Sequence, residues 1–139
     1  MARKSAWVRS PSRQRKLQPK IPDVLKLELS KTAAEFTETY LRPRNIKDPP
    51  KNPQFNYVTD VYIKWFGSTL FFCAGYCVPG PNALVPNFEH RFARMRYSGD
   101  NRFELSFRRY TDEWVELYTG QTPGECLEAI KTEPFFEVP

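Results

Sequence analysis

The chain has 139 residues, of which 40% are apolar and 15% aromatic, so it has the size of one domain and enough apolar residues to form a core. Its longest apolar stretch is too short to cross a bilayer, and no apolar segment of a secretory signal follows the basic N-terminus. We therefore expect a cytoplasmic protein without a membrane span, in which Cys73, Cys77 and Cys126 are free thiols.

Positive charge is concentrated at the N-terminus. Seven of the 21 Lys and Arg residues lie among the first 20 positions, where there is no Asp or Glu. The remaining 14 are slightly outnumbered by the 16 acidic residues. A strongly basic segment without an apolar period is typical of disorder. The sequence predicts a basic disordered arm over residues 1–22 and a single α+β domain over residues 23–139.

The first predicted element is a helix over residues 23–41. Apolar residues recur there at steps of three or four, which is the spacing of an amphipathic helix. Either Asp23 or Ser30 is a suitable N-cap residue. We expect Pro43 to end the helix, because the residue before a proline is disfavoured in helical geometry. A polar, proline-rich loop is expected up to residue 53.

A β-hairpin is predicted next. Residues 57–66 alternate with a period of two, and Gly67-Ser68 fits a type II′ turn that leads into a strand over residues 69–78. The second strand is apolar on both faces. We therefore expect it to be central in the sheet and covered on both sides.

Three more strands are predicted over residues 91–97, 102–109 and 114–118, with a turn at residues 98–101. Alternation places Phe92, Arg94 and Arg96 on one face of the first of these strands. If the turn sets Tyr97 opposite Phe103, then Arg96 faces Glu104 and Arg94 faces Ser106.

The last predicted element is a helix that begins at Thr122. Thr122 and Glu125 have the spacing of a capping box, and Pro123 occupies the first helical position. We expect its apolar side to consist of Cys126, Leu127, Ala129 and Ile130, and Phe135-Phe136 to fold back on the domain. The expected fold is α+β: an antiparallel meander of about five strands flanked by an N-terminal and a C-terminal helix.

The second half of the chain resembles a small bacterial family described only as a domain of unknown function. The resemblance is carried by Phe92–Tyr97, by Phe103–Arg109 and by Trp114–Tyr118, followed by a short helix. It covers about residues 30–135 and excludes the arm. It implies the helix–sheet–helix order described above, and it implies no activity.

The arm is the leading candidate for a functional site. Clustered cations with Ser and Pro spacers can neutralise phosphates without a fixed structure, and a tryptophan can stack on a base. The predicted nucleic-acid-binding residues are Arg3, Lys4, Trp7, Arg9, Arg13, Arg15, Lys16 and Lys20. The alternative interpretation is a solubilising or leader tail.

A secondary candidate is a face formed by Arg94, Arg96 and Arg108, with Phe92 or Tyr110 available to stack on RNA bases. The alternative interpretation is a ladder of cross-strand charge pairs on a solvated face. The net acidity of the domain favours this alternative.

Catalytic and metal-binding patterns are weak. His90 with Cys73 or Cys77 has the residue types of a base and a nucleophile, but nothing in the sequence places them together. One histidine and three scattered cysteines do not match zinc-ligand spacings. We predict no catalytic residues, no metal and no cofactor. The sequence favours a non-enzymatic binding or accessory protein that contacts RNA, DNA or a ribonucleoprotein through the arm. The alternatives are a protein–protein interaction module with an incidental tail, and an enzyme of unknown class.

Overall fold

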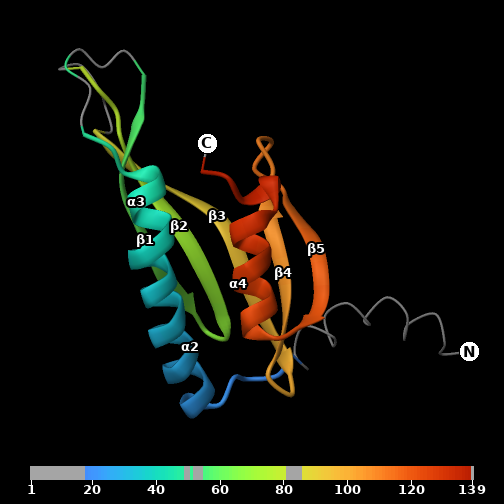
Figure 1. Cartoon of the computed structure of the whole chain (residues 1–139). Coiled ribbons are helices and arrows are strands. Elements are labelled where there is room, and N and C mark those ends of the chain that lie inside the picture. The colour runs from blue at the N-terminus through green and yellow to red at the C-terminus, as the bar shows by residue number, and fades with distance from the viewer. Residues whose placement is uncertain (1–17, 49–50, 52–54, 81–85, 139) are drawn as a thin grey trace, which may run out of the picture.

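The computed structural model describes residues 18–48, 51, 55–80 and 86–138. They form two layers, a five-stranded antiparallel sheet and a layer of helices that covers one of its faces (Figure 1). The strands are β1 (Tyr57–Phe66), β2 (Thr69–Cys77), β3 (Asn87–Gly99), β4 (Arg102–Arg108) and β5 (Trp114–Gln121). They lie in the sheet in chain order. The predicted α+β meander between two helices is confirmed.

The N-terminal helix passes through Pro43 rather than ending before it. It consists of α2 (Asp23–Phe36), a π-helical segment η1 (Thr37–Leu41) and α3 (Arg42–Asn45). The Arg42 N–H bonds the Thr37 carbonyl, five residues earlier instead of four. The wider turn comes just before the proline, whose ring would clash with a normal preceding turn. The prediction that Pro43 stops the helix was therefore wrong.

The start of this helix also differs from the prediction. Pro22 is the N-cap residue and no side chain caps the helix, so neither Asp23 nor Ser30 has that role. Ser30 lies inside the helix, where its hydroxyl donates to the Lys26 carbonyl at 2.7 Å. The same hydroxyl accepts a hydrogen bond from Trp65 Nε1 at 2.8 Å. Ser30 thus ties α2 to β1.

The core fills the space between the helices and the sheet. It is formed by side chains from one face of each strand and from the apolar sides of α2 and of α4 (Pro123–Thr132). The largest fully buried core side chains are Phe72, Phe92, Phe103, Leu70, Met95, Leu105 and Val61. α4 has the predicted capping box and buries its four predicted residues. Phe136, in the 3₁₀ turn η2 (Pro134–Phe136), is buried as expected.

A β-bulge in the pairing of β2 with β3 changes which residues of β3 face the core. Phe72 pairs with Ala93, but the next residue, Cys73, pairs with Arg91, so β3 has one extra residue at Phe92. Phe92 and Ala93 are both buried on the core side. Phe92 therefore does not share a face with Arg94, because a bulge shifts the alternation of a strand by one.

The position of β2 also corrects a prediction. β2 has a neighbour on each side, but β3 is the central strand. The helices cover only one face of β2 (Figure 1). Cys73, on the other face, is fully buried although it is outside the main core cluster. Its cross-strand neighbours there are Tyr62 of β1 and Arg91 of β3. Cys73 is therefore buried without a second helical layer.

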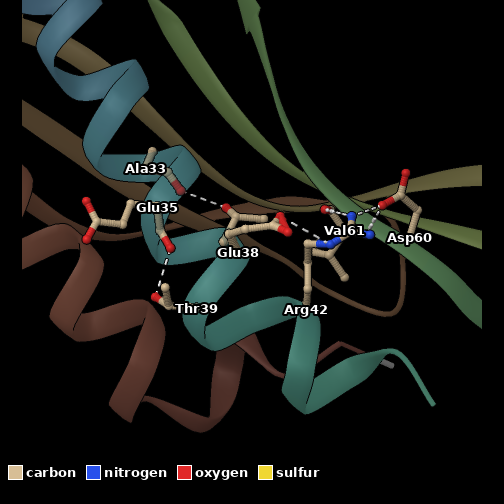
Figure 2. Close-up of polar contacts among 8 residues, drawn as sticks. Ala33, Glu35, Glu38, Thr39, Arg42, Asp60 and Val61 are labelled. Carbon is tan, nitrogen blue, oxygen red and sulfur yellow. Dashed lines mark hydrogen bonds and ion pairs between the residues drawn. The ribbon is translucent and has the colours of Figure 1, made fainter.

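The outer edge of β1 is blocked by α3. Figure 2 shows the Arg42 guanidinium between Glu38 and the edge strand. Arg42 forms an ion pair with Asp60 and donates to the Val61 carbonyl at 3.1 Å. The Asp60 carboxylate accepts from the Val61 N–H at 2.9 Å. Both outward backbone groups of Val61 are therefore satisfied, which protects this edge from pairing with another strand.

The described chain begins against the domain, at one end of the sheet. Ile21 is buried, and its N–H donates to Ser68 Oγ in the β1–β2 turn at 2.8 Å. Pro19 lies beside Gly99 at the end of β3. Residues 18–22, predicted as the last part of the arm, thus lie along the domain, and residues 1–17 are outside the described residues.

Within the described residues, no helix combines the length and the apolar character that crossing a bilayer requires.

Candidate functional site

The face of the sheet opposite the helices carries the candidate site, and we call it the open face. Figure 1 shows α2, α3 and α4 on the other side of the sheet. Strand register places large aromatic and positively charged side chains of all five strands on the open face. Six of them, which we call the arginine–aromatic cluster, are Phe66, Phe71, Arg91, Arg94, Arg108 and Trp114.

The aromatic rings of the cluster contact one another across the sheet. The centroids of Phe66 and Phe71 are 5.5 Å apart in an edge-to-face arrangement, and those of Phe71 and Trp114 are 5.8 Å apart. Phe71 is on β2 and Trp114 on β5, so their contact extends over the two strands between them. Ser106 of β4, which pairs with residues of β3 and β5 on this face, is only 3% exposed. Its small side chain leaves room for the large rings to meet.

Each arginine of the cluster lies over an aromatic ring. The guanidinium carbon of Arg91 is 4.5 Å from the Phe66 centroid and 5.1 Å from that of Phe71. Arg94 and Arg108 lie over Trp114 at 4.7 and 5.6 Å. Such cation–π contacts fix the plane of a guanidinium and hold it against the ring.

The guanidinium groups nearest Trp114 are incompletely hydrogen-bonded. The Nε atoms of Arg94 and Arg108 are buried and have no hydrogen-bond partner. Burial is the main cause that lowers the pKa of Arg94, and the positive charge of Arg96 lowers it further. An arginine has five N–H donors, so Arg94 retains donors for an incoming acceptor.

Glu89 neutralises one side of the open face. Its carboxylate accepts hydrogen bonds from Tyr62, from Lys64 at 2.9 Å and from Arg91 at 3.1 Å. The pKa of Glu89 falls to about 2, first because of the hydrogen bond from Tyr62 and then because of the two cations. Burial and the nearby Glu89 raise the pKa of the Tyr62 phenol in turn.

The predicted register of β3 and β4 is confirmed. Arg96 lies opposite Glu104 and Arg94 opposite Ser106. The Arg96–Glu104 ion pair measures 3.7 Å, as expected for a cross-strand charge pair. The arginines of this face therefore differ. Arg96 is paired with an acid, whereas Arg94 stacks on Trp114.

The root of the arm adjoins the open face. An open cavity of about 350 Å³ lies between residues 18–20 and the β1–β2 turn, and Phe66 of the cluster lines it. Lys20 is exposed there. The other predicted arm residues, Arg3, Lys4, Trp7, Arg9, Arg13, Arg15 and Lys16, lie outside the described residues. The chain thus enters the described domain next to the cluster.

The structure separates the aromatic residues that the sequence suggested for stacking. Phe92 is 2% exposed and belongs to the core, so it is not available on the open face. Tyr110 is 92% exposed at the β4–β5 turn. Sequence reasoning did not single out Phe66, Phe71 and Trp114. Buried Val61 and exposed Phe66 have opposite parity in β1, so alternation along this strand is a signal that could have placed Phe66 on the face away from the core.

His90 and Cys73 do not form a catalytic pair. His90 pairs with Ala74 and Cys73 with Arg91, so their side chains belong to opposite faces of the sheet. Burial, together with Arg108, lowers the pKa of His90. Burial raises the pKa of Cys73 to about 12, which makes it a poor nucleophile because the thiolate is the reactive form.

A second cavity lies where the two helices end. Its volume is about 280 Å³, and its lining includes Tyr40, Arg44, Lys131 and Glu137. The Tyr40 ring is flanked by both cations, at 5.5 and 5.4 Å. Arg44 also contacts Glu137 at 4.0 Å. The charges of this cavity are balanced by their neighbours, so the open face is the stronger candidate site.

The family described as Domain of unknown function (DUF3024) matches residues 4–137 of the chain. The match includes most of the arm, which corrects the expectation that the resemblance begins near residue 30. No curated protein and no solved structure matches the chain. With nearly all of its length matched, the chain belongs to the DUF3024 family of domains of unknown function.

Proposed function

We propose that this protein binds nucleic acid without catalysing a reaction, and that its basic N-terminal arm supplies the phosphate contacts. The observation that carries the proposal is the place where the arm joins the domain. Ile21 is anchored to Ser68 at one end of the sheet, beside Phe66 of the open face. The cations of the arm are thereby tethered next to a surface of arginines and aromatic rings.

The distribution of charge supports the arm as the source of affinity. The first 20 residues carry seven cations and no acid, whereas the rest of the chain has two more acids than cations. Attraction for phosphate is therefore concentrated at one end of the molecule. The family match begins at residue 4, so it includes most of the arm.

The proposal includes a cytoplasmic location, where nucleic acid is present and thiols stay reduced. The described residues contain the free cysteines Cys73, Cys77 and Cys126, of which two are buried. These thiols need no oxidising compartment.

The test compares the parent chain with a variant in which the six cations of residues 1–16 are replaced by glutamine. Binding to labelled single-stranded RNA and to duplex DNA is followed by fluorescence anisotropy as salt increases. If seven cations meet phosphates, the parent shows a log–log slope of about −5 on single strands, at roughly 0.7 per contact. The variant, which retains Lys20, is expected to show a slope of about −1.

A control for loss of positive charge outside the arm replaces the three exposed lysines Lys31, Lys47 and Lys51 of the domain by glutamine. We expect this control to bind nearly as tightly as the parent. Binding by the six-cation variant that equals the parent in affinity and slope would show that the arm does not contact phosphates.

A second candidate function is a protein-interaction module. Val24 and Leu27 favour it, because both are exposed apolar side chains on α2. A pull-down with and without nuclease separates the two functions. Partners that are lost on nuclease treatment support nucleic-acid binding, and partners that persist support the interaction module.

A further inference from the structure

We infer that the open face binds the bases of a single-stranded nucleic acid, which stack on the arginine–aromatic cluster while the arm holds phosphates of the same strand. This inference rests on the proposed function and extends it from the arm to the folded domain. It also names the form of nucleic acid that the domain selects.

The first argument is the composition of the open face. A solvated sheet face needs no large rings, yet Phe66, Phe71 and Trp114 lie together on this one. Phe66 is 48% exposed at the rim of the cluster. Phe71 and Trp114 are half-buried, so Phe66 is the exposed ring of this set. Aromatic rings at the surface of an antiparallel sheet are suited to stacking with unpaired bases, since every base has an aromatic face.

The second argument is the state of the arginines. Arg94 and Arg108 lie over Trp114 with buried Nε atoms that lack hydrogen-bond partners, although Arg108 Nε is 3.6 Å from the Asp112 carboxylate. A planar guanidinium held over a ring can itself stack with a base, and its outer N–H groups can donate to base or phosphate oxygens. Among the described residues Arg94 forms no ion pair, although the charges of Glu104 and Glu116 lie near enough to act on it.

The third argument concerns charge, and it explains why the open face should prefer single strands to duplexes. Most cations of the open face already have an acid, as in Lys64–Glu89, Arg91–Glu89, Arg96–Glu104 and Arg108–Asp112. The open face alone is therefore a weak phosphate-binding surface. Its rings can reach bases only where the bases are unpaired, because a duplex keeps its bases stacked inside. We expect the arm to bind either form and the open face to favour single strands.

The fourth argument is continuity. Phe66 belongs to the cluster and also lines the cavity beside Lys20, so the arm and the cluster meet at one point. A strand whose phosphates contact the arm can continue onto the rings of the open face. A tether of this kind raises the local concentration of bases at the open face without any change in the stacking itself.

The test uses the full chain and three labelled probes of about 12 nucleotides, which is within the range of single-strand site sizes. The probes are single-stranded RNA, single-stranded DNA of the same sequence, and a duplex. The variants are Phe66→Ala and Trp114→Ala. The control is Phe135→Ala, because Phe135 is 50% exposed, close to the 48% of Phe66, but lies in η2 on the helical side.

We expect Phe66→Ala and Trp114→Ala to weaken single-strand binding about fivefold or more, which is the lower end of stacking contributions. Duplex binding should stay within about twofold of the parent, as should every probe with Phe135→Ala. A larger loss with RNA than with DNA would support the inference and identify RNA as the ligand. Urea unfolding checks that each variant is folded, and half-exposed Phe66 provides the decisive variant if Trp114→Ala unfolds.

Three results would overturn the inference. In the first, both variants bind single strands as tightly as the parent and with the same salt dependence. This result would show that the open face does not bind bases, and it would not contradict the proposed function of the arm. An equal loss on single strands and duplexes would show that the open face contacts only the backbone. In the third, the parent chain binds no probe at low salt, which would contradict both the inference and the proposed function.

Discussion

The guanidinium of Arg94 lies over the ring of Trp114, 4.7 Å from its centroid, although β4 separates the strands that carry the two residues. Burial lowers the pKa of Arg94, and its Nε atom has no hydrogen-bond partner. The contact therefore gains cation–π energy and loses hydration energy. Because the lost hydration offsets the cation–π energy, Arg94 contributes little to the net stability of the fold. Its planar guanidinium is nevertheless well placed to contact a ligand.

Replacement of Arg94 by methionine tests this balance. We expect the free energy of unfolding in urea to change by less than about 1 kcal/mol, because the lost cation–π contact is offset by the removal of a poorly hydrated charge. Single-strand affinity should fall several-fold. Arg44→Met, on the helical side, is the control for a general loss of charge. A destabilisation above about 2 kcal/mol would assign Arg94 a structural role.

Glu89 should make stability depend on pH in the acid range. Its folded-state pKa of about 2 lies below the unfolded value of about 4.3, so the unfolded chain takes up the proton first as pH falls. The stabilisation is complete above about pH 4.3 and is lost as pH falls through 2. We expect Glu89→Gln to lower stability at pH 6 by about 1–2 kcal/mol, since solvent screens the partly exposed group.

The measurement for Glu89 is urea unfolding of parent and variant at several pH values between 6 and 2. The difference between the two proteins should shrink as pH falls. A difference that stays constant across this range would mean that the loss comes from packing or hydrogen bonding rather than from the charge.

The three thiols should react in the order of their exposure. Burial raises the pKa values of Cys73 and Cys126 to about 12, so both remain protonated thiols near neutral pH. Cys77 is half-buried. In native protein we expect a bulky thiol reagent to label Cys77 first and the other two only on unfolding. Rapid labelling of Cys73 would show that side chains do not cover it on the open face.

Thr122→Ala should destabilise the domain by about 1 kcal/mol. Thr122 Oγ1 accepts from the Glu125 N–H at 3.2 Å, and the Glu125 carboxylate accepts from the Thr122 N–H at 2.8 Å, so one substitution disrupts the capping box. Thr39→Ala is the matched control. Thr39 lies inside a helix, where alanine is the better helix former, and we expect no loss of stability there. Equal effects in thermal unfolding would contradict the role of the cap.

Arg42→Leu should both destabilise the protein and promote self-association. Its loss leaves Asp60 and the Val61 carbonyl without their partner and exposes the edge of β1. We expect a cost of about 1–3 kcal/mol and larger species in light scattering at high protein concentration. Arg44→Leu is the control, since Arg44 pairs outside the sheet. A monodisperse Arg42→Leu variant would show that the edge is protected by other means.

The sequence was sufficient wherever local chemistry decides the structure. The capping box of Thr122 and Glu125, the five strands and the pairing of Arg96 with Glu104 all follow from residue types at fixed spacings. Gly67 has the positive φ of 58° that its predicted turn requires.

The predictions that the structure contradicts fall where one inserted residue changes the period of a strand or a helix. The bulge at Phe92 moved that residue into the core and placed Arg91 with Arg94 on the open face, which alternation alone does not reveal. The π-helical turn carried the helix past Pro43 in the same way, by adding a residue to one turn. The meeting of Phe71 with Trp114 depends on sheet geometry across several strands, so neither strand by itself indicates it.

The meander, finally, has a consequence for how the protein folds. Every strand pairs with its neighbours in the chain, so sheet formation needs only short loop closures and the contact order of the sheet is low. The longest-range hydrogen bond within the described residues joins Tyr40 to the Lys131 carbonyl, 91 residues away. We therefore expect the hairpins to form the folding nucleus and the two helices to dock late. Substitutions at the Tyr40 contact should then accelerate unfolding and leave the folding rate nearly unchanged.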